Sequence, residues 1–289
     1  MIVYAVIVTF NPEIDTLNKC VQSVVPQVEK LLIIDNASFN QNDINKLKNN
    51  MLFHKEKVEV ICNEGNLGVA AALNIALEHS INNGVEWLLT LDQDSIIPNG
   101  MISKYKSICK PMLGQLCCNL RNPNSPELTI DKMSPLTIPI DNNEKTANYF
   151  VYACITSGTL LNVIAAKKCG GFRDELFIDY VDYDISLNLL ENGYPTLFVP
   201  DMCMEHSFGT AEEKSFLGYH FTDYNFSPVR EYYKAKNCIY MIKRYPRFKK
   251  FFKKALLYDF ICPLLAFRGK CVSSFNKGFW EGVFTKSKI

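Results

Sequence analysis

Two aspartates one residue apart, Asp92 and Asp94, follow directly on the apolar run Trp87 to Leu91. A continuous apolar run predicts a strand buried on both faces, as in a parallel sheet covered by helices. The carboxyl end of such a strand is where open α/β sheets bind ligands. Two carboxylates held together repel each other unless they share a cation, such as the Mg²⁺ or Mn²⁺ that accompanies a diphosphate. The alternative is two solvated aspartates that open a turn before Pro98.

Two further polar residues, Asp182 and His206, stand in settings that suit chemistry. Asp182 lies between Asp179 and Asp184, and those charges would raise the pKa of a partly buried carboxyl group, which is a usual way to make a general base. The alternative for Asp182 is a helix cap and nothing more. His206 follows the strand-like run 196–199 and should also emerge at a loop, although a single histidine is more often structural than a ligand.

The elements that would carry these residues alternate regularly up to residue 94. Apolar runs predict strands, and apolar residues at helical spacing predict helices between them. This order predicts a parallel sheet with right-handed crossovers, whose strands end in polar loops at one shared edge. The predicted strands cover residues 2–9, 30–34, 58–62 and 87–91, and the predicted helices cover about 17–24 and 69–79.

The middle of the chain is less regular. Residues 119–148 contain four prolines and many asparagines and are expected to form a loop, either a lid or an acceptor-side insertion. Residues 149–162 resemble a strand with an interruption at Ser157 and Gly158. Helices are expected from about Asp182 to residue 191 and again over residues 228–245.

Composition limits the class of protein. The 289 residues are 48% hydrophobic and carry a net charge of +1, so a large core can form and no global field would attract nucleic acid. The eleven cysteines are odd in number and contain no C-x-x-C pair, which favours a reduced cytoplasmic compartment. Neither a signal peptide nor an apolar run long enough to span a bilayer is expected.

Several short motifs follow one another along the first 245 residues. In chain order they are Thr9-Phe10-Asn11-Pro12, Ile34 to Ser38, Asn66-Leu67-Gly68 with Asn74, Asp92-Gln93-Asp94, the cluster Asp179 to Asp184 before Asn192-Gly193-Tyr194, and His206. Their order and spacing resemble a family 2 glycosyltransferase of the GT-A fold. Within that family the closest likeness is to bacterial rhamnosyltransferases, carried by Phe177 to Asp182, His206 to Gly209, and Arg230 to Lys234 with Asn237.

The resemblance implies a role for each matching residue. Asp35 would hydrogen-bond a pyrimidine base, while Thr9, Asn11 and the loop from Asn66 to Gly68 would shape the nucleoside pocket. Asp92 would face the ribose or the metal, and Asp94 and His206 would ligate an Mg²⁺ or Mn²⁺ ion that neutralises the leaving diphosphate. Asp182 would take the proton from an acceptor hydroxyl in a single displacement with inversion. The family often has Arg-Asn where this chain has Lys236-Asn237, and Arg at the position of Asn188.

The tail is strongly basic. From Lys243 onward the chain has twelve Lys or Arg residues and only two acidic ones, Asp259 and Glu281. At helical spacing an apolar face forms, made of Phe248, Phe251, Phe252, Ala255 and Leu256. A basic amphipathic helix of this kind predicts binding to a membrane surface. The alternatives are a helix docked on the core with a solvated basic face, or an oligomer contact such as a homodimer.

These observations predict an α/β protein with a GT-A domain over residues 1–245 and a helical extension over 246–289. The resemblance implies that it would transfer L-rhamnose from dTDP-L-rhamnose to a glycan or lipid-linked acceptor of a bacterial surface polysaccharide, and the basic tail would place it at the inner face of the plasma membrane. The alternative donor is a UDP-hexose or UDP-galactofuranose. A nucleotidyltransferase would open with a Gly-rich phosphate loop, which the first loop lacks. The intact Asp92, Asp94, Asp182 and His206 argue against a non-catalytic scaffold.

Overall fold

The computed structural model describes residues 1–50, 55–122, 125–129, 148–206, 212–216 and 218–285. The chain forms two compact units. The N-terminal unit contains Met1–Glu175 and Asp182–Ser207, and the C-terminal unit contains Leu176–Val181 and Phe208–Ile289. The predicted boundary at residue 245 separates a catalytic domain from an extension by function. The two compact units have other boundaries and do not test it, so it stays a prediction.

The first half of the N-terminal unit is the predicted parallel sheet. Strands β1 (Val3–Thr9), β2 (Lys30–Asp35), β3 (Val58–Cys62) and β4 (Trp87–Asp92) lie in the order β3-β2-β1-β4, and all three pairings are parallel. The strands β2 and β4 are buried along almost their whole length, as a strand covered on both faces must be. Their carboxyl ends therefore meet at one edge of the sheet.

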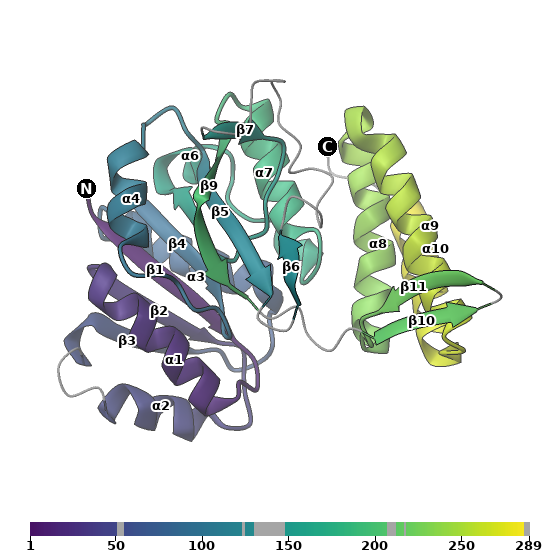
Figure 1. The fold of residues 1–289 in the computed structure, drawn as a ribbon, viewed down its shortest axis with the longest axis horizontal. Helices are drawn as coiled ribbons and strands as arrows, with labels where there is room; N and C mark the ends of the chain where they lie inside the picture. Colours follow the sequence, from purple (N-terminus) through teal and green to yellow (C-terminus); the bar gives the residue numbers. More distant parts are fainter. Residues whose placement is uncertain (51–54, 123–124, 130–147, 207–211, 217, 286–289) are drawn as a thin grey trace. The chain divides into compact units, whose positions relative to one another are not determined.

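Helices join these strands and cover them. α1 (Ile14–Val24) follows β1, α2 (Gln41–Asn50) follows β2, and α3 (Gly68–Asn82) returns the chain from β3 to β4. In Figure 1, α1 and α2 lie in front of the strands and α3 lies behind them, as right-handed crossovers require. The strand order changes direction between β1 and β4, and such a switch point is where open α/β sheets bind ligands.

The sheet becomes mixed beyond β4. β8 (Thr159–Asn162) is antiparallel to β4, β5 (Gln115–Asn122) is antiparallel to β8, and β9 (Thr196–Glu205) is parallel to β5. β7 (Tyr149–Val151) pairs with β9, and β6 (Ser125–Thr129) pairs with β5. Among the described residues of this half, the α-helices are α4 (Met101–Ile108), α6 (Val163–Lys168) and α7 (Val181–Glu191).

The expected loop over residues 119–148 is therefore wrong at its start. Residues 119–122 continue β5, because the backbone of 119–121 pairs with β9 and Asn122 pairs with Ser125 of β6 (residues 125–129). Local composition could not reveal either partner. The rest of the expected lid or acceptor-side insertion lies outside the described residues.

The described residues of the C-terminal unit include three α-helices, a short 3₁₀ turn at Pro246–Phe248, a hairpin and the segment 176–181. The helices are α8 (Pro228–Arg244), α9 (Lys249–Leu265) and α10 (Gly269–Phe284), and the hairpin pairs β10 (Glu212–Phe216) with β11 (Tyr219–Asp223). α10 lies close against α8, where a Cβ atom on Gly278 would overlap the carbonyl oxygen of Tyr232. No helix among the described residues is both long and apolar enough to cross a membrane.

Phe252, the central residue of the apolar face predicted to bind a membrane, points into the protein. Phe252 is completely buried, and its ring lies 6.0 Å from the ring of Tyr180 in an edge-on contact. Phe251, Ala255 and Leu256 are only partly exposed. This face of α9 therefore packs within the C-terminal unit, as the alternative of a docked helix expects.

Candidate active site

Asp92, Asp94 and His206 converge at the carboxyl edge of the sheet. Each of them has a ligand atom within 4.8 Å of those of the other two. His206 Nε2 lies 3.6 Å from Asp92 Oδ2, and His206 Nδ1 lies 3.7 Å from Asp94 Oδ1. The aspartates are partly exposed and the histidine is buried. The structure therefore brings together the three residues named from the sequence as metal ligands, although 111 residues separate Ser95, next to Asp94, from His206.

Three backbone hydrogen bonds hold the histidine in this position. Strand β9 ends at Glu205, whose N–H and C=O both pair with Ile96 in the loop after β4, at 3.3 and 3.2 Å. The His206 N–H also donates to the Arg121 carbonyl oxygen at 3.1 Å. Because β4 and β9 are thus linked just beyond their ends, His206 must lie beside the aspartates.

Two buried serines, Ser95 and Ser157, support the cluster and were missed in the sequence. Ser95 Oγ lies 3.1 Å from His206 Nδ1 and 2.6 Å from Ser157 Oγ, and Ser157 Oγ accepts the Asp92 N–H. A partner on Nδ1 orients the ring so that Nε2 is available as a ligand, as in known metal sites. The predicted strand over residues 149–162 is interrupted at Ser157, and this interruption was the feature of the sequence that could have pointed to it.

The electrostatics of the cluster fit a divalent cation. Burial raises the pKa of Asp94, His206 opposes this rise, and the charge of Asp92 adds to it. The charged form of Asp94 is thus disfavoured where it stands, and a cation between the two carboxylates would compensate that charge. Two carboxylate oxygens and one imidazole nitrogen are donors suited to Mn²⁺ or Mg²⁺.

The expected base-binding residue, Asp35, is completely buried at the end of β2. Its Oδ1 accepts hydrogen bonds from the hydroxyl groups of Thr9, at 2.8 Å, and Ser38, and its Oδ2 accepts the Ser38 N–H at 2.9 Å. These three bonds fix the orientation of the carboxylate at the end of β2. Thr9 and Asp35 are direct partners across β1 and β2, and binding of a base by Asp35 stays a prediction.

The other expected donor residues build the loops at the same edge. Asn11 has a φ of 49° and bridges two loops, because its N–H donates to Ser38 Oγ at 2.7 Å and its Oδ1 accepts the Phe39 N–H at 2.9 Å. Asn66 Oδ1 accepts the Gly68 N–H at 2.9 Å. Gly68 opens α3 with a φ of 85°, a conformation that favours glycine. These contacts show loop-forming roles, and the donor-binding roles stay predictions.

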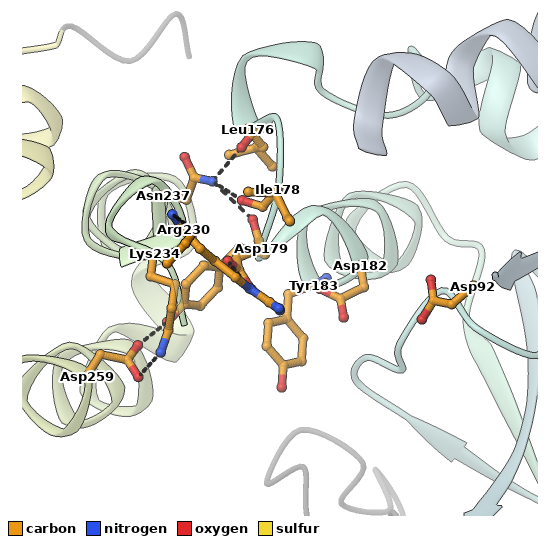
Figure 2. Close-up of polar contacts among 12 residues, drawn as sticks. Asp92, Leu176, Ile178, Asp179, Asp182, Tyr183, Arg230, Lys234, Asn237 and Asp259 are labelled. Atoms are coloured by element: carbon orange, nitrogen blue, oxygen red, sulfur yellow. Dashed lines mark hydrogen bonds and ion pairs between the residues drawn. The ribbon is translucent and has the colours of Figure 1, made fainter. Parts of the chain in front are cut away.

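Asp182 is half-buried in the first turn of α7, where its Oδ1 accepts the Tyr183 N–H at 2.9 Å. The two acids expected to raise its pKa are each paired with an arginine. Asp179 binds Arg230 at 2.9 Å, and Asp184 lies 3.5 Å from Arg173. Their charges are largely compensated, so the argument from like charge is not supported. Asp182 and Asp92 belong to the same N-terminal unit, and Figure 2 draws both side chains; a catalytic role for Asp182 at the ligand edge stays a prediction.

Comparisons with known proteins agree with this geometry. Residues 4–178 match the family described as glycosyl transferase family 2. The dTDP-rhamnosyl transferase RfbF of Shigella flexneri is 31% identical over 258 residues, which cover 84% of this chain and 80% of that protein. The mannosyltransferase PcManGT from Pyrobaculum calidifontis, solved with GDP-Man and Mn²⁺, has a TM-score of 0.61 at 15% identity, over 99% of this chain and 76% of its own.

A second solved structure, GalNAc-T7 with UDP, GalNAc and Mn²⁺, has a TM-score of 0.58 at 18% identity. That match covers 83% of this chain and 51% of the other. At these identities the two structures show a shared fold. The predicted GT-A architecture is confirmed.

Proposed function

Because this chain belongs to glycosyl transferase family 2, we propose that it transfers L-rhamnose from dTDP-L-rhamnose to a glycan or lipid-linked acceptor. The chain is a glycosyltransferase on the strength of the family match and of its identity to RfbF. The observation that supports the finer proposal is the convergence of Asp92, Asp94 and His206 in a chain that is 31% identical to a dTDP-rhamnosyl transferase.

Asp92, Asp94 and His206 are the residues that would hold Mg²⁺ or Mn²⁺. When bound there, the cation would supply positive charge to the diphosphate of the donor. Two structural neighbours were solved with Mn²⁺, which supports a metal-dependent reaction here. Asp35 and Thr9 at the ends of β1 and β2, with Asn11, Asn66 and Gly68, would bind the nucleoside.

Asp182 would act as the general base. Its half-buried carboxylate would accept the proton of the acceptor hydroxyl as that oxygen attacks the anomeric carbon, and the configuration would invert. Asp182→Asn keeps the size of the side chain and removes the base, so transfer should fall by about 10²–10⁴-fold while donor binding is retained. An Asp182→Asn enzyme as active as wild type would exclude this role.

The donor can be tested without an acceptor. Ligand binding raises the melting temperature by mass action, so dTDP, UDP, GDP and CMP should be titrated with and without Mn²⁺. Metal-dependent stabilisation by dTDP or dTDP-rhamnose is expected. A preference for UDP would favour the UDP-hexose or galactofuranose alternative, and no response to any nucleotide would contradict donor binding.

The basic C-terminal unit would bind the inner face of the plasma membrane. Lys250, Lys253 and Lys254 on α9 are exposed, and the same helix exposes Leu257 and Leu264 at 59% and 48%. Basic residues beside exposed apolar ones suit an anionic lipid surface. Vesicles containing phosphatidylserine should co-sediment with the protein at low salt, and replacing the three lysines with glutamate should abolish this. Equal sedimentation of that variant would contradict membrane binding through α9.

A further inference from the structure

The six residues before Asp182 form a strained segment. Phe177, Asp179 and Tyr180 have φ values of 60°, 62° and 64°, although none of them is glycine. L residues rarely adopt this left-handed conformation, and it persists only where surrounding contacts impose it. The segment 176–181 belongs to the C-terminal unit, and the chain passes from it directly to Asp182.

The side-chain amide of Asn237 holds the backbone of this segment. Its Nδ2 donates to the carbonyl oxygens of Leu176 at 2.7 Å, Ile178 at 2.8 Å and Asp179 at 3.1 Å (Figure 2). Asn237 is 1% exposed, so water cannot replace these bonds. The two N–H groups of this amide, shared among three carbonyl oxygens of one short segment, fix the path of that segment.

Other residues on the same face of α8 hold its side chains. Arg230 donates from Nε and Nη2 to the Asp179 carboxylate at 2.9–3.2 Å, and the ring of Tyr233 stacks on Phe177 with centroids 4.6 Å apart. Positions 230, 233 and 237 are separated by three and four residues and therefore share one side of the helix. We call Arg230, Tyr233 and Asn237 the α8 clamp.

We propose that the α8 clamp positions Asp182 for proton transfer, with Asn237 as its central positioning residue. This inference rests on the proposed role of Asp182 as the base. The clamp holds the segment in which Asp179 and Tyr180 have left-handed backbone, three and two residues before Asp182, and so it fixes the stretch of chain that leads directly to Asp182. The Asn237 amide is suited to this task because a carboxylate at that position would repel the three carbonyl oxygens.

The first test is independent of chemistry. In Asn237→Ala, hydrogen–deuterium exchange should rise at the amides of residues 177–183. The matched control is Asn162→Ala, because Asn162 is also buried and its Nδ2 donates to two carbonyl oxygens, those of Pro111 and Leu113. Unchanged exchange in Asn237→Ala, or an equal rise at 177–183 in Asn162→Ala, would overturn the proposal.

The second test measures transfer from dTDP-L-rhamnose to a synthetic octyl rhamnoside. Asn237→Ala should lower kcat by about 10–100-fold with little change in the KM for donor, as expected for a displaced catalytic group. Asn162→Ala should keep kcat. In an Asp182→Asn background, Asn237→Ala should cost almost nothing further, because both changes remove the same proton transfer.

The outcomes distinguish the proposed role of Asp182 as the base from its positioning by the α8 clamp. Full activity of Asp182→Asn would refute the proposed base and leave the exchange experiment to decide the clamp. An inactive Asp182→Asn combined with the same fold-loss for Asn237→Ala in both backgrounds would refute positioning through Asp182. If Asn237→Ala does not fold, Arg230→Gln serves instead, since the Arg230 side chain is 39% exposed and its loss leaves no buried cavity.

Discussion

Replacing Asp94 with asparagine should stabilise the metal-free protein and abolish its response to metal. Asp92 and Asp94 have carboxylate oxygens within 4.8 Å of each other. Two unit charges at that separation repel by about 1 kcal/mol in water and by about 3.5 kcal/mol at an effective dielectric constant of 20. Both side chains are partly exposed, so we expect a repulsion near the lower figure.

The raised pKa of Asp94 also indicates that removing its charge should stabilise the folded protein. Burial and Asp92 raise that pKa against the opposing effect of His206, so the ionised form of Asp94 is less favourable in the folded protein than in the unfolded chain. A neutral amide of the same shape removes that penalty. A gain of about 1 kcal/mol corresponds to about 2–4 °C in Tm for a chain of this size.

The assay is thermal unfolding in EDTA and in Mn²⁺. In EDTA, Asp94→Asn should melt above wild type. In saturating Mn²⁺ the order should reverse, because wild type gains about 2.7 kcal/mol at a metal concentration of 100 Kd and the variant has lost a ligand. Asp201→Asn, at an exposed carboxylate on β9, should melt as wild type does in both conditions. A variant that melts below wild type in EDTA and still responds fully to Mn²⁺ would refute the reasoning.

Two further predictions concern the C-terminal unit. Burial raises the pKa of Glu231 to about 7, which is above its unfolded value of 4.5, so its stabilising contribution is complete below about pH 4.5 and is lost as the pH rises through 7. Between pH 4.5 and 8, the free energy of unfolding of wild type should therefore fall by on the order of 3 kcal/mol because of this residue. Urea unfolding at the two pH values measures this fall. It should be absent from Glu231→Gln and present in the control Glu78→Gln, whose residue is exposed. Gly278→Ala should lower stability by about 1–3 kcal/mol or more, because the new methyl group would overlap the Tyr232 backbone on α8. Gly269→Ala, where a Cβ meets nothing within 4 Å, should leave the Tm nearly unchanged, and equal effects of the two substitutions would contradict close packing of α8 on α10.

Much of the first half of the fold followed from local patterns. The apolar runs before Asp35 and Asp92 could be recognised as buried parallel strands because a strand covered on both faces has no polar alternation. The placement of Asp92 and Asp94 at a ligand edge followed from the same rule, since every parallel strand ends on that edge. Asp182 and His206 were selected from their settings, an acid cluster and the end of a strand-like run, and the family motifs then gave each of them a role.

The remaining features depend on pairings between distant segments. The strand over residues 119–122 exists because β9 pairs with it, and the mutual pairing of Ile96 with Glu205 is what carries His206 to the aspartates. The sequence by itself determined which residue types stand at strand ends, because burial periodicity is a local property. Only the tertiary structure decided that Ser95 and Ser157 support the metal cluster, that arginines compensate Asp179 and Asp184, and that Asn237 holds the chain before Asp182. Those contacts join residues 50 or more positions apart in most cases, and their energies depend on distances that no local pattern encodes.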